Sequence, residues 1–196
     1  MNLTPFPVAL KNGTCVLIRE VTPDDRHLLQ MGFAHLSDRS KYFRFLAARH
    51  NLTAAELDDF TAFNGPDHVA IGALINSADT PEPVGIGRYI RLPDQTHIAE
   101  IAITIVDEHQ RQGLGSVLLG VLAKFASLNG ITEFSALVHG NNRPMQGLLN
   151  QIGGKQDTPA GPEIDFHIPL PGHSGELSAT SVSCILKDAY PLAQIT

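Results

Sequence analysis

One stretch constrains the fold of this chain more than any other: an apolar strand, then a turn with glycines, then an apolar helix. Residues 98–106 are apolar except for Glu100 and Thr104, which is typical of a central strand covered on both faces. The turn Gln110–Gly115 follows, and apolar residues recur on one helical face from about Gly113 to Ser127. Because the first N–H groups of a helix lack intrahelical acceptors and the helix dipole is positive there, this order predicts an anion site in an α/β sheet.

The rest of the chain shows shorter helix and strand patterns without an internal repeat. Helices are expected to start at Thr22, Ser37, Thr53 and Asn142, each of which is a favourable N-cap. We interpret residues 1–13 as a loosely held arm, residues 155–196 as C-terminal strands and tail, and the whole of 1–196 as one domain. Strands are expected over residues 14–19, 68–75, 83–91, 98–106, 131–138, 163–170 and 178–186.

Composition excludes several classes of function. The 196 residues carry a net charge of −6, so nothing suggests the basic surface that a nucleic-acid-binding protein needs. We find no apolar run of membrane-spanning length and no signal-peptide pattern, and we therefore expect no membrane partner and a cytoplasmic location. Neither the histidines nor the two cysteines have metal-ligand spacing, so no metal is expected.

Three phosphate-binding motifs compete for the glycine turn. A P-loop needs a lysine after its last glycine, and none follows Gly115. A dinucleotide fingerprint needs a third glycine where Leu118 stands, followed by an acidic residue at a strand end. The interpretation left is a pyrophosphate cradle after a long strand, which begins with glutamine or arginine, has glycine three positions later and ends two positions further in glycine or alanine.

Three stretches around this turn resemble the GNAT acetyltransferase superfamily: the strand 99–106, the cradle 110–115, and Asn142 at the start of the next helix. The resemblance runs from about Thr14 to Gly154, and it is nearest to the bacterial protein-lysine acetyltransferases in residues 37–45, 99–102 and 142–145. It implies a mixed α/β (α+β) GNAT-like fold, with a central, mostly antiparallel sheet of six to seven strands flanked by about four helices. It also implies acetyl-CoA as the acyl donor.

The resemblance assigns roles to particular positions. Amides around Ile103, Thr104 and Ile105 would bind the pantetheine arm and polarise the thioester carbonyl, which requires this strand to separate from its neighbour. Asn142 would contact the pantetheine or the acetyl end. The pyrophosphate would be held by the cradle, made of Gln110, Arg111, Gln112, Gly113, Leu114, Gly115 and Ser116.

Glu100 is the candidate general base. An amine must lose a proton before it attacks, and burial in an apolar strand raises the pKa of a carboxyl group toward the range of a useful base. The alternative is a structural carboxylate paired with Arg88 or Arg91 on the preceding strand. The resemblance favours catalysis. Leu149 occupies the position where many GNAT enzymes carry a tyrosine acid, so no general acid is assigned.

Other polar residues have ordinary explanations beside functional ones. His97, His109 and His139 are interpreted as loop residues, although His139 lies close enough to Asn142 in sequence to reach the cleft. Residues 41–45 are interpreted as helix packing, with substrate contact as the alternative. The acceptor amine stays open between a protein lysine and a small molecule, and a catalytically silent acyl-CoA-binding module and a homodimer are also considered.

Overall fold

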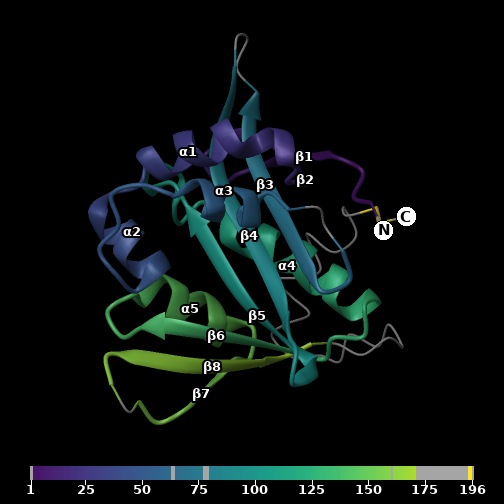
Figure 1. The fold of residues 1–196 in the computed structure, drawn as a ribbon, viewed down its shortest axis with the longest axis vertical. Helices are drawn as coiled ribbons and strands as arrows, with labels where there is room; N and C mark the ends of the chain where they lie inside the picture. The colour runs from purple at the N-terminus through teal and green to yellow at the C-terminus, as the bar shows by residue number, and fades with distance from the viewer. Residues whose placement is uncertain (1, 63–64, 77–79, 160, 171–193, 196) are drawn as a thin grey trace.

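The computed structural model describes residues 2–62, 65–76, 80–159, 161–170 and 194–195 (Figure 1). Its centre is an eight-stranded sheet in the order β1-β2-β3-β4-β5-β6-β8-β7. Neighbouring strands are antiparallel except β5 and β6, which are parallel. The strands are β1 (Phe6–Ala9), β2 (Cys15–Glu20), β3 (His68–Asn76), β4 (Pro81–Leu92), β5 (Gln95–Ile105), β6 (Glu133–His139), β7 (Lys155–Gln156) and β8 (Glu163–Pro169).

Five α-helices cover the sheet within the described residues. They are α1 (Arg26–Ala34), α2 (Asp38–Phe45), α3 (Ala54–Phe60), α4 (Leu114–Leu128) and α5 (Arg143–Gln151), with short 3-10 turns η1 (Pro23–Asp25) and η2 (Asp107–His109). Helix α4 lies so close to β4 that a Cβ on Gly85 or Gly87 would come within 3.1 Å of a leucine methyl group of the helix. Helices α1–α3 cover the opposite face. The mixed α/β fold is confirmed, with one strand more than the upper expectation. No helix of the described chain is long and apolar enough to cross a membrane.

Three of the four predicted caps form on α-helices, whereas Thr22 precedes the 3-10 turn η1 and the N-cap of α1 is Asp25. The Ser37 hydroxyl accepts the Ser40 N–H at 3.2 Å, and the Asn142 side chain accepts the Met145 N–H at 3.3 Å. Thr53 and Glu56 form the full capping box. These signals were readable because each cap involves residues three positions apart in the chain.

The N-terminal arm was predicted wrongly. Residues 6–9 form β1 on the edge of the sheet, and Leu3 and Leu10 are buried on either side of it. The turn after β1 also contacts the glycine turn, because the Lys11 N–H donates to the Gln112 carbonyl at 3.1 Å. At the other end β8 confirms the predicted strand 163–170, β7 was not predicted, and the strand expected over 178–186 lies outside the described residues.

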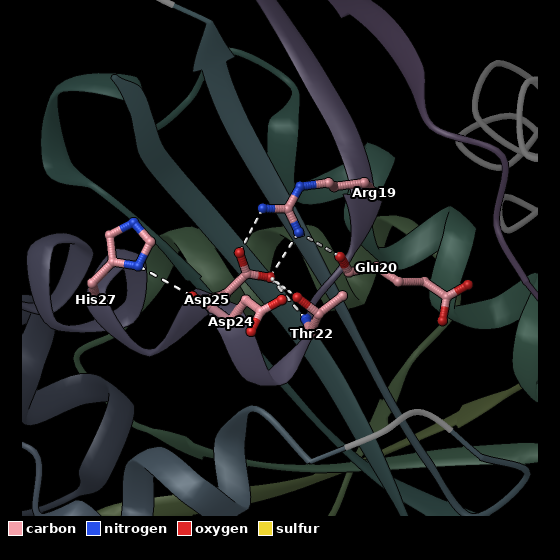
Figure 2. Close-up of polar contacts among 6 residues, drawn as sticks. All are labelled: Arg19, Glu20, Thr22, Asp24, Asp25 and His27. Atoms are coloured by element: carbon pink, nitrogen blue, oxygen red, sulfur yellow. Dashed lines mark hydrogen bonds and ion pairs between the residues drawn. The ribbon is translucent and has the colours of Figure 1, made fainter. Parts of the chain in front are cut away.

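An ion pair fixes the start of α1 on the sheet (Figure 2). Arg19 of β2 donates to both oxygens of Asp25 at 2.7 and 2.6 Å, and the Thr22 N–H donates to the same carboxylate at 2.8 Å. Asp25 is buried. Burial alone would raise the pKa of Asp25, but the hydrogen bonds from Arg19 and Thr22 outweigh it and the pKa is lowered.

Candidate functional site

Strands β5 and β6 separate after three paired positions. The pairs are Ile98–Glu133, Ala99–Phe134 and Glu100–Ser135, and within the described residues the pairing stops there. Beyond it β5 stays paired with β4, while β6 stays paired with β8 to its end at His139. Figure 1 shows the two strands diverging, with α2 across the open side. The predicted separation of the 98–106 strand from its neighbour is therefore confirmed.

The direction of each β5 amide follows from the register. The Val106 N–H donates to the Val84 carbonyl at 3.0 Å, and alternate residues of a strand direct their amides to the same edge. Thr104 therefore directs its N–H toward β4, whereas Ile103 and Ile105 direct theirs into the opening. The expectation that the Thr104 amide faces the site was wrong; its neighbours on either side do. No bulge is needed, because the β4–β5 register runs without a break from Gly85–Ile105 to Arg91–Ala99.

Glu100 lies where the two strands part. Its side chain is exposed, so the expectation of a buried carboxylate was wrong. The suggested structural partners are engaged elsewhere, since Arg88 pairs with Asp59 at 3.3 Å and Arg91 with Asp67 at 2.6 Å. The apolar sequence around Glu100 suggested burial, but this position is uncovered on its face of the sheet, where Ile90, directly opposite on β4, is also exposed.

The loop between β5 and α4 is tied to α2. Ser37 and Ser40 donate their hydroxyls to the Asp107 carboxylate, each at 2.8 Å. Burial alone would raise the pKa of Asp107, but the bonds from Ser37 and Ser40 prevail and the pKa is lowered. Gln110 completes the connection, because its side-chain amide donates to the Ile105 carbonyl at 3.1 Å and to Ser40 at 3.3 Å. The Gln110 side chain therefore positions the loop.

The structure requires glycine at the two positions of the turn for different reasons. Gly113 is the N-cap of α4 with a φ of +93°, a conformation that glycine adopts without strain. Gly115 has no such requirement; a Cβ there would lie 3.2 Å from Leu148 and 3.4 Å from Ile105, so it allows α5 and β5 to pack closely. Arg111 also has a positive φ, of 60°. The turn is thus a strained backbone bend in front of a helix.

The amides of the turn are not equivalent. The Gln110 N–H donates to the Asp107 carbonyl at 3.3 Å and the Ser116 N–H to the Gly113 carbonyl at 3.1 Å, so both ends of the predicted cradle are satisfied within the chain. Leu114 and Gly115 begin the helix and have no intrahelical acceptor for their N–H groups. An anion would therefore be bound by the centre of the cradle.

Lys11 lies beside the glycine turn, which the sequence did not indicate. A Cβ on Gly113 would lie 3.9 Å from Lys11 Cε, so the lysine side chain crosses the turn. A cation beside the positive end of a helix strengthens an anion site. About 100 residues separate the two positions in the chain, and a hydrogen bond from the Lys11 N–H to the Gln112 carbonyl holds them together in the fold.

A cavity of about 590 Å³ lies at the open end of the strand gap. It is lined by Arg39, Tyr42 and Phe43 of α2 and by His139, Asn141 and Arg143 after β6. His139 packs against both aromatic rings, each with a centroid distance of 5.5 Å. The Asn141 N–H donates to His139 Nδ1 at 3.0 Å, which in the neutral ring leaves the proton on Nε2. His139 therefore does reach the cleft, and residues 41–45 serve both packing and cavity lining.

The family model and the relatives that match this chain are all described as acetyltransferases. The family model described as an acetyltransferase (GNAT) domain matches residues 16–155. Acetyltransferase Pat of Mycolicibacterium smegmatis is 29% identical over 151 residues, 77% of this chain and 44% of the relative. Acetyltransferase PA5475 of Pseudomonas aeruginosa is 29% identical over 164 residues, 83% of this chain and 88% of the relative. The chain thus spans less than half the length of the mycobacterial relative.

Solved structures agree with this. The GNAT domain of S. lividans PAT superposes with a TM-score of 0.77 at 29% identity, covering 85% of this chain and 97% of that one. A cAMP-binding acyltransferase from Mycobacterium smegmatis has a TM-score of 0.62 at 22% identity, covering 97% of this chain and 55% of that one, a likeness in fold alone.

Proposed function

This chain belongs to the GNAT acetyltransferase family, and from that premise we propose that it transfers the acetyl group of acetyl-CoA to a protein lysine, with Glu100 as general base. The observation that carries the proposal is the position of an exposed carboxylate where β5 and β6 part, in line with open strand amides and a helix N-terminus. The thioester supplies an activated acyl group. The protein must bind the donor and remove a proton from the acceptor amine.

The donor side of the site fits a long, phosphorylated thiol ester. The amides of Ile103 and Ile105 face the gap and suit the pantetheine arm and the thioester carbonyl. Leu114 and Gly115 offer their N–H groups to a pyrophosphate at the start of α4. Lys11 adds a positive charge beside them. Asn142 is engaged as the N-cap of α5, so its contact with the pantetheine would use the amide nitrogen of its side chain.

The acceptor must lose a proton as it attacks. The amine nitrogen forms a bond to the carbonyl carbon, the C–S bond breaks with its electron pair left on sulfur, and the proton from nitrogen passes to Glu100, directly or through one water. An exposed carboxylate is accessible to a bulky acceptor, and positioned general bases contribute about 10²–10⁴-fold to rate.

The surroundings of Glu100 favour a protein acceptor. Tyr42, Ile90 and Leu137 are among the few large apolar side chains of the described chain that are well exposed, at 39%, 43% and 48%. Ile90 is directly opposite Glu100 in the β4–β5 register, and Leu137 is two positions beyond the residue paired with Glu100 on β6. Exposed apolar groups around a reactive centre are typical of protein contact surfaces.

Replacement of Glu100 by glutamine tests the base. We expect Glu100→Gln to lower kcat about 100-fold, with the affinity for acetyl-CoA within twofold of the wild type by calorimetry. Glu108→Gln, which changes another exposed carboxylate, is the matched control and should keep normal turnover. Full turnover by Glu100→Gln would refute the proposed role.

A CoA-release assay on lysine peptides and on a panel of small amines separates the acceptor classes. Peptide turnover above that of the free amines is expected. Faster turnover of a polyamine or amino acid would identify a small-molecule enzyme instead. Tight acetyl-CoA binding without turnover on either panel would point to a silent binding module.

A further inference from the structure

A second cavity lies beneath helices α1–α3, on the face of the sheet opposite α4. Its volume is about 80 Å³, and its walls are mainly aliphatic and aromatic side chains. The polar lining comes from Arg44 of α2, Arg88 of β4 and Thr104 of β5. The proposed acetyl transfer assigns no task to these three side chains.

Two of the polar groups are buried donors that lack an acceptor. Arg88 is 5% exposed, and its Nη1 has no hydrogen-bond partner among the residues that the structure describes. The same holds for Thr104 Oγ1 within that part of the chain. Nearly all buried polar groups in native proteins are hydrogen-bonded, because an unpaired donor keeps the full cost of its lost hydration. Two such groups on one cavity point to a ligand that accepts hydrogen bonds.

The charge of the cavity is positive. Arg88 and Arg44 lie over the Phe60 ring, at 4.6 and 5.9 Å from its centroid. Burial and, to a lesser extent, the charge of Arg88 lower the pKa of Arg44 to about 10, and the charge of Glu100 partly opposes this fall. The Asp59 carboxylate that pairs with Arg88 is 65% exposed and so lies at the rim. An anion in the cavity would relieve this repulsion, and a carboxylate matches the planar guanidinium fork.

The cavity begins where the acyl group of a donor is expected. Ala102 and Thr104 line it from β5, and the residue between them, Ile103, directs its amide into the strand gap. Arg88 is directly opposite Ala102 in the register, and both residues line the cavity. An acyl chain that extends from the strand gap past Ala102 would enter the cavity lined by the two guanidinium groups, and an acyl group longer than acetyl extends further in that direction.

We propose that this cavity binds the carboxylate end of a dicarboxylic acyl group carried by CoA, so that the protein transfers carboxyacyl groups of the succinyl type. The inference rests on the donor site of the proposed function. The bonds made and broken are those of acetyl transfer, with the distal carboxylate unchanged and held by Arg44, Arg88 and Thr104.

Binding to the intact protein without acceptor tests the inference, with calorimetry of acetyl-CoA, butyryl-CoA and succinyl-CoA. Butyryl and succinyl groups have chains of equal length and differ in the terminal carboxylate. We expect succinyl-CoA to bind about tenfold more tightly than butyryl-CoA, the scale of one buried charge-assisted contact. Arg44→Met keeps the apolar stem and should abolish that preference. Arg26→Met, which removes an exposed arginine paired with Asp58, should retain it.

The outcomes separate this inference from the proposed function. Equal binding of butyryl-CoA and succinyl-CoA by the wild type overturns the inference and needs no variant that might fail to fold. A rise in the KM for the acceptor in Arg44→Met, with the preference for succinyl-CoA intact, would assign the cavity to the acceptor and overturn it too. Failure of all three thioesters to bind would refute the donor site, and with it the proposed function.

Discussion

The Asp25 carboxylate accepts four hydrogen bonds, two from the Arg19 guanidinium and two from Thr22, and it joins β2 to the start of α1. Asp25→Asn keeps the shape but leaves the half-buried Arg19 charge without its partner. Breaking a buried pair by removing one member costs about 3–5 kcal/mol. Because the Asn oxygen still accepts one of these bonds, we expect a loss of about 3 kcal/mol, and a fall in Tm of roughly 6–12 °C for a domain of this size.

The effect depends on pH with a defined sign. The folded pKa of Asp25 is lowered, so the pair contributes stability above the unfolded value of about 4, and this stability is lost as pH falls through the folded pKa. Urea unfolding at pH 7 and at pH 3 measures it, and the difference between wild type and Asp25→Asn should shrink at the lower pH. Asp24→Asn, a change in the neighbouring exposed acid, should cost less than about 0.5 kcal/mol. A loss below about 1 kcal/mol for Asp25→Asn at pH 7 would refute the reasoning.

Three further predictions concern the turn and the sheet edge. Gly113→Ala should lower the free energy of unfolding by about 1–2 kcal/mol, measured by thermal unfolding, and should weaken CoA binding. Gly130→Ala, at a φ of +77° on the other end of α4, should cause the same loss of stability and leave CoA binding intact. Lys11→Met should weaken binding of CoA about threefold to tenfold, less so at high salt, while binding of pantetheine, which has no phosphate, stays at the wild-type value. A hydrogen bond of 2.8 Å to Glu133 raises the pKa of His167. The pair therefore stabilises the fold below about pH 6.5, and this stabilisation is lost as pH rises through the pKa of His167 in the folded protein. Glu133→Gln should lower the pKa of His167 in an NMR titration.

Much of the fold could be predicted because its signals are local. The caps at Ser37, Thr53 and Asn142 each depend on a side chain and an amide three residues away, and the apolar period of α4 is continuous over four turns. β1 could not be predicted, since four residues with a proline become a strand only when β2 is beside them. The two-residue β7 likewise exists only through its pairing with β8.

The site likewise combines features that have local sequence signals with features that depend on residues distant in sequence. The resemblance carried by the strand with Glu100, the turn and Asn142 implied the opening between β5 and its neighbour, and the glycine turn indicated the helix that follows it. The exposure of Glu100 was not predictable, because the sequence around it does not show whether a helix covers that face of β5 at this position. Lys11 and the pair Arg44–Arg88 were missed because each is brought to its partner by strands or helices distant in sequence.

Strand β5 contributes to both the proposed donor site and the proposed carboxylate cavity, because alternate residues of a strand point in opposite directions. Residues 103 and 105 direct their amides into the gap with β6, while residues 102 and 104 direct their side chains to the face beneath α1–α3. The β4–β5 register therefore fixes both the amides proposed to bind the acyl donor and the side chains proposed to contact its acyl chain. A slip of one residue between β4 and β5 would turn the wrong amides to the gap and bury Ile103 where Thr104 now lies. The close packing of Gly85 and Gly87 fixes which face of β4 lies against α4, because a Cβ at either position would come within 3.1 Å of a leucine methyl group of that helix.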